Sequence, residues 1–234
     1  MIFEQLFDEK SSTYTYIISS GKGREGLIID PVIENTDIYL NFMNSMDLKL
    51  VKVIDTHIHA DHVTGLNELH KRTNCVKIMG ESSKSEVIDL RVKENDKITI
   101  ENLELKTMYT PGHTDCSYSF LFDDKIFTGD TLLINGTGRT DFQNGDARAQ
   151  YDSLFNKILK LPDDTKVFPA HDYNGQKFST ILKEKNNNPR LQVNTVEEYV
   201  DIMTNLKLAN PKMMDIAVPA NLKGLTLNQI ENKI

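Results

Sequence analysis

The stretch T-H-I-H-A-D-H at residues 56–62 places three histidines and one aspartate within six positions. It follows residues 48–54, a short run rich in Leu, Val and Ile that predicts a buried strand. Alternate side chains of an extended segment share a face, so His57 and His59 can point the same way. Neutral imidazole is the commonest metal ligand, and a nearby carboxylate suits divalent cations. The stretch predicts a metal site at a strand end, with a metal-free histidine patch as the alternative.

Composition limits the class of protein and its partners. The chain has 234 residues, 39% of them hydrophobic and 26% charged, a balance typical of a soluble protein with one or two domains. A net charge of -7 argues against nonspecific nucleic-acid binding, which needs a basic surface. No apolar run approaches the roughly 20 residues that span a bilayer, and the N-terminus has no signal-peptide pattern. We expect neither a nucleic-acid partner nor a membrane association.

The two cysteines indicate the redox compartment. Cys75 and Cys116 form neither a C-x-x-C pair nor a disulfide framework. A reducing cytosol is the simpler interpretation of this usage, so we expect a cytoplasmic protein.

Short apolar stretches alternate with segments of helical spacing along the whole chain. Strands are predicted at residues 1–8, 13–20, 25–30, 48–54, 76–79, 97–100, 103–108, 117–122, 125–128 and 167–169. Helices are predicted at residues 35–46, 63–72, 147–161, 176–185 and 196–208, and residues 213–234 are too irregular to assign. Each half gives several strands and then helices. We therefore expect two packed sheets with helices on the outside, built as one domain.

Three further strand ends carry residues that bind metals. His113 lies in T-P-G-H-T, Asp130 in T-G-D-T, and His171 in P-A-H-D-Y. Each alone has an ordinary alternative, because a loop histidine is usually a surface residue and an aspartate after glycine is usually a cap or turn residue. Five of the six histidines nevertheless fall in such loops. The sixth, His70, lies among apolar residues of a predicted helix, and we interpret it as structural.

The four motifs in this order resemble those of the metallo-β-lactamase superfamily. The resemblance implies an αββα sandwich of two mixed β-sheets flanked by helices, with the metal site at the edge between the sheets. It also implies one domain over residues 1–234, in which residues 190–234 form a helical or irregular extension. The implied set of metal-site residues is His57, His59, Asp61, His62, His113, Asp130 and His171.

A finer resemblance lies in T-G-D-T-L-L-I-N-G-T-G-R-T-D-F-Q at residues 128–143, which is similar to the persulfide dioxygenases. Residues 3–16, 29–32, 171–173, 188–191 and 216–222 share this similarity, so it covers essentially the whole chain and leaves no room for an appended rhodanese domain. The chain departs from many relatives at Thr137 and Lys223, where those proteins have cysteine. Neither position belongs to the metal set, and their effect on thiol handling or regulation stays open.

The resemblance implies a function in hydrogen sulfide metabolism. One Fe(II) per chain would be held by His57, His113 and Asp130 and would oxidise glutathione persulfide with O2 and water to sulfite and glutathione. Relatives suggest a homodimer. The other ligand-type residues would be outer partners of the iron or a second metal site: His59, Asp61, His62 and His171. The glutathione carboxylates need cationic or hydroxyl donors, for which the candidates are Arg139, Tyr173 and Arg190, with internal salt bridges as the alternative.

Two other functions compete with this interpretation. A hydroxyacylglutathione hydrolase of the glyoxalase II type would use the same ligands to hold two metals and cleave a thioester with a bridging hydroxide. A non-catalytic metal-binding or sulfur-sensing module is the second alternative. Residues 138–143 and the short C-terminal extension favour the dioxygenase over the hydrolase. The complete set of ligand-type residues counts against the non-catalytic module.

Overall fold

The computed structural model describes residues 1–209, 211, 213–226 and 229 and contains two six-stranded sheets. The first sheet has the order β1-β2-β3-β4-β5-β6, and its strands are β1 (Ile2–Asp8), β2 (Thr13–Ser19), β3 (Glu25–Ile29), β4 (Lys49–Ile54), β5 (Val76–Gly80) and β6 (Leu90–Val92). The second has the order β12-β11-β10-β9-β8-β7, and its strands are β7 (Lys97–Ile100), β8 (Leu103–Tyr109), β9 (Tyr118–Phe122), β10 (Lys125–Gly129), β11 (Lys166–Pro169) and β12 (Ser179–Thr180). Both sheets mix parallel and antiparallel pairs.

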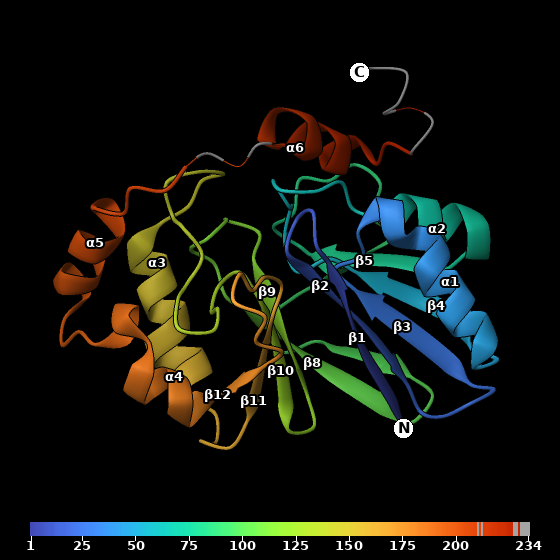
Figure 1. Ribbon diagram of the computed structural model, residues 1–234, viewed down its shortest axis with the longest axis horizontal. Coiled ribbons are helices and arrows are strands. Elements are labelled where there is room, and N and C mark those ends of the chain that lie inside the picture. The colour runs from blue at the N-terminus through green and yellow to red at the C-terminus, as the bar shows by residue number, and fades with distance from the viewer. Residues whose placement is uncertain (210, 212, 227–228, 230–234) are drawn as a thin grey trace.

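Helices cover the outer faces of both sheets (Figure 1). The first sheet is covered by α1 (Thr36–Ser45) and α2 (Leu66–Thr73). The second is covered by α3 (Ala147–Asp152), α4 (Ile181–Asn187) and α5 (Val196–Thr204). Helix α6 (Met214–Lys223) lies across the top of the sandwich in this view. The predicted αββα sandwich is confirmed.

Strand β2 shows how the sequence pattern builds the layers. All seven of its residues are buried. Tyr14, Tyr16 and Ile18 point into the core between the sheets, whereas Ile17 points into the core beneath α1 and α2. Across the sheets, the ring centroids of Tyr16 and Phe127 lie 4.9 Å apart. A strand covered on both faces requires apolar or aromatic residues at both parities, which explains the almost continuous apolar character of this segment.

Four predicted helices differ from the structure at their ends, and one of them is residues 196–208, of which only Val196–Thr204 are helical. The helix predicted at residues 63–72 begins only at Leu66, because Val63 O and Thr64 pair with the backbone at residues 32–33. The helix predicted at residues 147–161 is α-helical only to Asp152 and continues as a π turn and a 3-10 turn. The helix predicted at residues 176–185 begins at Ile181, because residues 179–180 pair with β11.

Two short strands and one helix have no counterpart in the sequence prediction. Strands β6 and β12 span three and two residues, which is too short for a periodic pattern. Helix α6 occupies part of the stretch left unassigned at residues 213–234, of which 227–228 and 230–234 lie outside the described residues. Among the residues that the structure describes, we find no helix with the length and apolar character that a bilayer crossing requires.

Candidate metal centre

Loops at one edge of the sandwich bring the ligand-type residues together. His57 follows β4, His113 follows β8, Asp130 follows β10 directly, and His171 follows β11. Strands β8, β10 and β11 run in the same direction, because β9 lies antiparallel between β8 and β10 and because β10 and β11 pair in parallel. Their carboxyl ends therefore meet at one edge, where α/β sheets place their chemistry.

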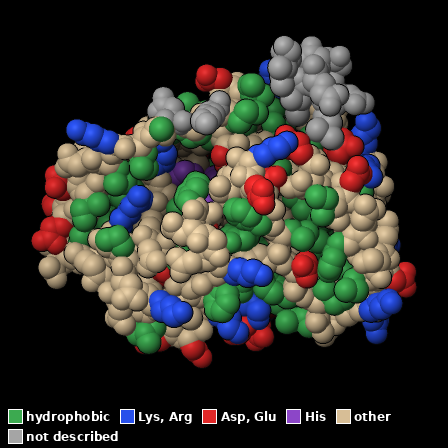
Figure 2. Space-filling model, viewed as in Figure 1, with side chains coloured by type: hydrophobic (Ala, Val, Ile, Leu, Met, Phe, Trp, Pro, Cys, Tyr) green, Lys and Arg blue, Asp and Glu red, His purple; other side chains and the backbone are tan. Residues whose placement is uncertain are grey.

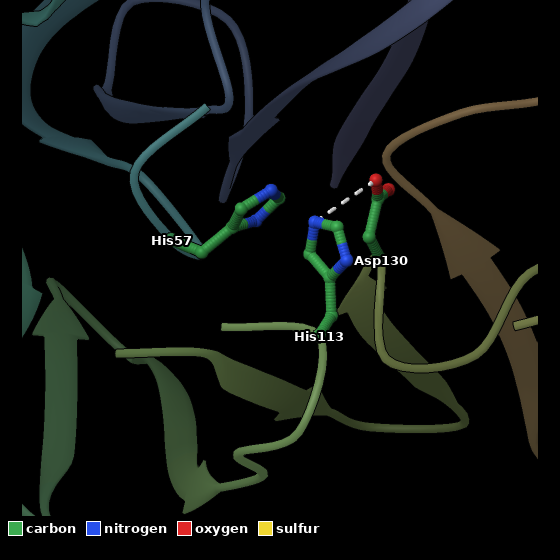
Figure 3. A group of neighbouring side chains, drawn as sticks. All are labelled: His57, His113 and Asp130. Carbon is green, nitrogen blue, oxygen red and sulfur yellow. Dashed lines mark ion pairs between the residues drawn. The ribbon is translucent and has the colours of Figure 1, made fainter. Parts of the chain in front are cut away.

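His57, His113 and Asp130 form a group whose donor atoms all lie within 4.8 Å of one another. Figure 3 shows the three side chains converging from three separate loops. The His113 Nε2 and Asp130 Oδ2 atoms are 3.6 Å apart, and both side chains keep about an eighth of their surface exposed, 12% and 13% respectively. Histidine side chains are also visible at the bottom of a hollow in Figure 2. The group is thus open on one side.

Two hydrogen bonds orient the imidazoles of this group. Thr56 donates its hydroxyl to Asp30 at 3.0 Å, so its oxygen accepts from His57 Nδ1 at 2.9 Å. His113 Nδ1 donates to the carbonyl oxygen of Arg139 at 2.7 Å. Both rings therefore carry their proton on Nδ1 and present the Nε2 lone pair to the site. Burial, with the nearby His59 and His113, holds the pKa of His57 well below its usual value, so this ring is neutral, as a metal ligand must be.

A glycine allows the two halves of the sandwich to approach here. Gly129 has a φ of +52°, and a Cβ atom at this position would lie 2.6 Å from Thr56 Oγ1. A side chain would separate Asp130 from the loop that carries His57. The glycine before the aspartate in T-G-D-T is thus explained by close packing between the two loops.

His171 links the group to a second carboxylate. Its Nδ1 donates to Asp130 Oδ1 at 2.7 Å, and its Nε2 donates to Asp61 Oδ2 at 2.8 Å. Burial opposes the charged ring, but Asp130 and Asp61 outweigh it and raise the pKa of His171 well above its usual value. Burial likewise opposes the Asp130 carboxylate, and His171 outweighs it, so the pKa of Asp130 is lowered. The charged ring holds one oxygen of Asp130 and leaves the other toward His113.

A second group, His59, Asp61 and His62, also has donor atoms within 4.8 Å of one another. Within the described part of the chain, His59 Nδ1 and His62 Nε2 are buried without a hydrogen-bond partner. His59 Nε2 contacts Asp30 at 3.2 Å, and Asp30, Asp55 and His59 form a third, fully buried group. Burial opposes the charged ring, but Asp30 outweighs it and raises the pKa of His59 to about 9.

A buried polar chain holds the segment that carries the acceptor of His113. The Tyr199 hydroxyl donates to Gln150 Oε1 at 2.8 Å, and Gln150 Nε2 donates to Gly138 O at 3.1 Å. Arg190 Nη1 donates to the carbonyl oxygen of Thr137 and contacts its Oγ1 at 3.2 Å. The predicted substrate contact Arg190 is therefore engaged with the backbone beside the metal group, and Thr137 occupies a position inside this network.

The other two predicted substrate contacts lie in different surroundings. Arg139 forms a bidentate ion pair with Asp141 at 2.6 and 2.7 Å, donates to Ala209 O, and lies over the ring of Phe142. The side chain of Tyr173 is exposed, and its ring is stacked parallel to the His171 ring at a centroid distance of 6.3 Å. Tyr173 is thus the most accessible of the three candidates.

Several residues that shape the centre were not singled out from the sequence. Asp30 accepts from the Thr56 backbone at 2.7 Å and from its hydroxyl, and Thr13 contacts both Asp61 and His171. Asp30 belongs to the I-D-P-V segment, which resembles the corresponding segment of relatives. Its positive φ of 51° marks it as unusual, but a backbone angle is known only from the structure. Thr13 carries no sequence signal, since it reads only as a strand residue.

Comparison with known proteins places this arrangement among relatives. A profile of the metallo-beta-lactamase superfamily matches residues 9–171. The chain is 40% identical to persulfide dioxygenase ETHE1, mitochondrial, of Mus musculus over 95% of this chain and 88% of the relative. The crystal structure of ETHE1 from Myxococcus xanthus matches with a TM-score of 0.92 and 45% identity, covering 95% of this chain and 98% of that chain. A hydroxyacylglutathione hydrolase of Dictyostelium discoideum is 32% identical over 76% of this chain and 69% of its own length.

The dioxygenase and hydrolase relatives differ in their identity to this chain and in the share of it that they cover. The superfamily profile ends at His171 and so includes every ligand-type residue of the site. The similarity to the persulfide dioxygenases continues through nearly the whole chain, whereas the hydrolase match is lower in both identity and coverage. The chain therefore belongs to the metallo-β-lactamase superfamily and, within it, to the persulfide dioxygenase family.

Proposed function

We propose that the protein is a persulfide dioxygenase that oxidises glutathione persulfide with O2 and water to sulfite and glutathione. The observation that carries this proposal is the convergence of His57, His113 and Asp130, in a chain that is 40% identical to a persulfide dioxygenase. Two histidines and one carboxylate on one face leave open positions for substrate and O2. In the balanced reaction the terminal sulfur is oxidised, O2 is reduced, and sulfite takes both atoms of O2 and one oxygen of water.

We propose further that His57, His113 and Asp130 hold one Fe(II) per chain. The donor set fits, because both Nε2 lone pairs and one Asp130 oxygen are directed to a common space. Bound iron supplies the electron-transfer chemistry that O2 requires. The chain's own residues fix the geometry: Thr56 and Arg139 O set the tautomers of the two imidazoles, and His171 holds the carboxylate.

The remaining ligand-type residues are proposed to support this centre rather than to catalyse. Asp61 accepts from His171 and contacts His62 Nδ1 at 2.8 Å, so its carboxylate joins the two rings. His59 is tied to Asp30. In this role Asp61, His62 and His171 form the hydrogen-bonded chain that orients Asp130, and His59 is an outer residue held by Asp30.

One observation favours a second candidate function, hydroxyacylglutathione hydrolysis at a two-metal centre. His59 Nδ1 and His62 Nε2 are buried without a partner among the described residues, and with Asp61 they form a compact donor group. Two adjacent metals activate a bridging hydroxide for hydrolysis. The lower identity and coverage of the hydrolase relative make this the weaker candidate. Membership in an enzyme family leaves the non-catalytic module without support.

Metal analysis of anaerobically purified protein separates the two enzymes. We expect one iron per chain, because the proposed triad forms a single site. We also expect O2 uptake that depends on glutathione persulfide, because two histidines and one carboxylate leave coordination positions open for both substrates. The measurements are elemental analysis and oxygen-electrode traces, with apo protein reloaded with Zn²⁺ as the control that should consume no O2. Two zinc ions per chain, together with cleavage of S-lactoylglutathione and no O2 uptake, would favour the hydrolase and reject the dioxygenase.

Substrate binding is proposed to involve Tyr173, Arg139 and Arg190. The glutathione carboxylates need donors, and the exposed hydroxyl of Tyr173 is available beside His171. Arg139 is paired with Asp141, so a carboxylate would compete with that partner. Arg190 is held by Thr137, and one edge of its guanidinium is committed to the backbone.

Tyr173→Phe tests the most accessible of these contacts. We expect the KM for glutathione persulfide to rise about fivefold with kcat almost unchanged, the effect of losing one exposed hydrogen bond of about 1 kcal/mol. Steady-state O2 uptake measures both constants. Tyr151→Phe, in the outer helical layer where its ring stacks on Phe155, is the matched control. An unchanged KM for Tyr173→Phe would remove this hydroxyl from the binding site.

The larger organisation of the protein is also proposed. We propose one domain over residues 1–234, with residues 190–234 as its extension. The hydrogen bond from the Thr64 backbone to Asn221 supports this proposal, because it ties the extension to the rest of the domain. The resemblance to relatives supports a homodimer acting in hydrogen sulfide metabolism. Cysteine usage supports a cytoplasmic location, although the Mus musculus relative is named mitochondrial.

A further inference from the structure

A buried amide on α6 enters the loop after β4, which carries four of the ligand-type residues. Asn221 Oδ1 accepts from the Thr64 backbone N–H at 2.9 Å. Its Nδ2 donates to His59 O at 2.9 Å and to His62 O at 3.0 Å. The side chain is buried, and the loop has no regular helix or strand between residues 57 and 63. One side chain therefore pairs three buried backbone groups that the loop cannot pair by itself.

The two carbonyls bound by Asn221 flank Asp61. The Asp61 carboxylate accepts from His171 Nε2 at 2.8 Å, and His171 Nδ1 donates to Asp130 Oδ1 at 2.7 Å. A continuous chain of contacts thus runs from the amide through the loop backbone, Asp61 and His171 to Asp130. A shift of the loop would move the Asp61 carboxylate and, with it, the His171 ring. Asp130 would then lose the hydrogen bond that fixes the orientation of its carboxylate.

Helix α6 is also anchored by contacts that do not involve the ligand-type residues of this loop. Ala217 and Ala220 pack in a cluster with Ile33 and Val63, and their small side chains allow the helix to approach closely. Ser85 donates its hydroxyl to Asn221 O at 3.1 Å. The view in Figure 1 places α6 above the edge where the strands of both sheets end. The helix therefore offers a fixed point from which the amide reaches into the loop.

A primary amide is the only short side chain that offers both an acceptor and two N–H donors. Aspartate has the same shape but would bring a carboxylate against two carbonyl oxygens. Serine is too short to reach all three groups. The match between the three loop groups and the amide is thus specific to asparagine at this distance.

We propose that Asn221 is a positioning residue of the metal centre, which sets the orientation of Asp130 through the loop at residues 59–64, Asp61 and His171. The inference rests on the proposed role of Asp130 as a metal ligand. It gives the A-V-P-A-N segment of α6 a function in the centre, although that segment lies more than 40 positions beyond the last ligand-type residue in the sequence.

The test compares Co²⁺ affinity across full-length variants, measured by chelator competition, together with the visible Co²⁺ absorption spectrum. Asn221→Ser and Asn221→Asp are expected to bind Co²⁺ about tenfold more weakly and to show a changed spectrum, the scale found for outer partners of metal ligands. Ser85→Ala is the matched control, because it removes a hydroxyl that bonds the same helix at Asn221 O and Leu222 O without touching the loop. It should keep the affinity and spectrum of the unmodified chain.

Thermal unfolding of the metal-free variants separates positioning from general stability. Asn221→Ser is included because Asn221→Asp buries a charge and can fail to fold. If Asn221→Ser lowers Tm but keeps the Co²⁺ affinity and spectrum, Asn221 is only structural and the inference is wrong. The same loss of affinity in Ser85→Ala would also overturn it, since any loosening of α6 would then suffice. An unmodified chain that binds no Co²⁺ would instead reject the proposed metal centre, and this inference with it.

Discussion

His113→Ala is expected to abolish iron binding and persulfide-dependent O2 uptake together. The substitution removes the Nε2 atom that faces Asp130 and the ring whose Nδ1 bonds the carbonyl of Arg139. Loss of outer partners alone costs about 10–100-fold in metal affinity, so loss of a ligand should exceed about 100-fold. Iron content after anaerobic loading and oxygen-electrode assays measure the two effects, and circular dichroism verifies that the variant is folded.

A matched control for this variant lies on α2. His70 bonds the carbonyl of Cys75 at 2.7 Å and lies outside the metal groups, so His70→Ala also deletes one imidazole and one hydrogen bond. It should keep iron and activity, in line with its interpretation as structural. Full activity in His113→Ala would exclude His113 from the ligand set, and equal losses in both variants would indicate general destabilisation instead.

Gly138→Ala is expected to disrupt the centre almost as strongly, although it adds only one carbon atom. A Cβ atom at this position would lie 2.3 Å from Asp130 O and 2.7 Å from His113 Nδ1. The Gly138 N–H also donates to Asp130 O at 2.6 Å, so the two segments cannot separate without losing that bond. Both ligand-bearing segments must shift, and we expect iron affinity to fall by about 100-fold or more, the upper range for disturbed ligand support.

Gly136→Ala provides a control two residues away in the same loop. The nearest atom to its added Cβ would be Leu133 Cβ at 4.0 Å, so there is room for the methyl group. This variant should bind iron like the unmodified chain, as measured by the same competition and loading assays. Normal iron affinity in Gly138→Ala would show that the loop can yield and would contradict the close packing that we describe.

Local sequence features predicted most of the architecture and the residues of the centre. The strands were predictable because each is a short apolar run bounded by turn residues, as at residues 48–54 and 125–128. The ligand-type residues were recognisable because metal donors stand where those strands end. The short strands β6 and β12 and the delayed start of α4 were not predictable, because they depend on pairing with residues that are distant or that carry no periodic signal.

The predicted substrate arginines show a different kind of limit. A sequence reveals that Arg139 and Arg190 are cationic, but not which acceptors they meet. In the fold Arg139 pairs with Asp141, and Arg190 bonds the backbone at Thr137. The same is true of Asp30, whose carboxylate supports Thr56 and His59 only because two strand ends lie side by side.

The sequence by itself determined the chemical types at the site and their placement at strand ends, because donor atoms and apolar periodicity are local properties. Only the tertiary structure decided which nitrogen of each imidazole faces the centre, because Thr56 and the carbonyl of Arg139 take the Nδ1 protons. It also decided that His171 joins two carboxylates and that Asn221 holds the loop between them. Most of these relations are hydrogen bonds between residues far apart in the sequence, 162 positions for Asn221 and His59, and chain folding alone brings such residues together.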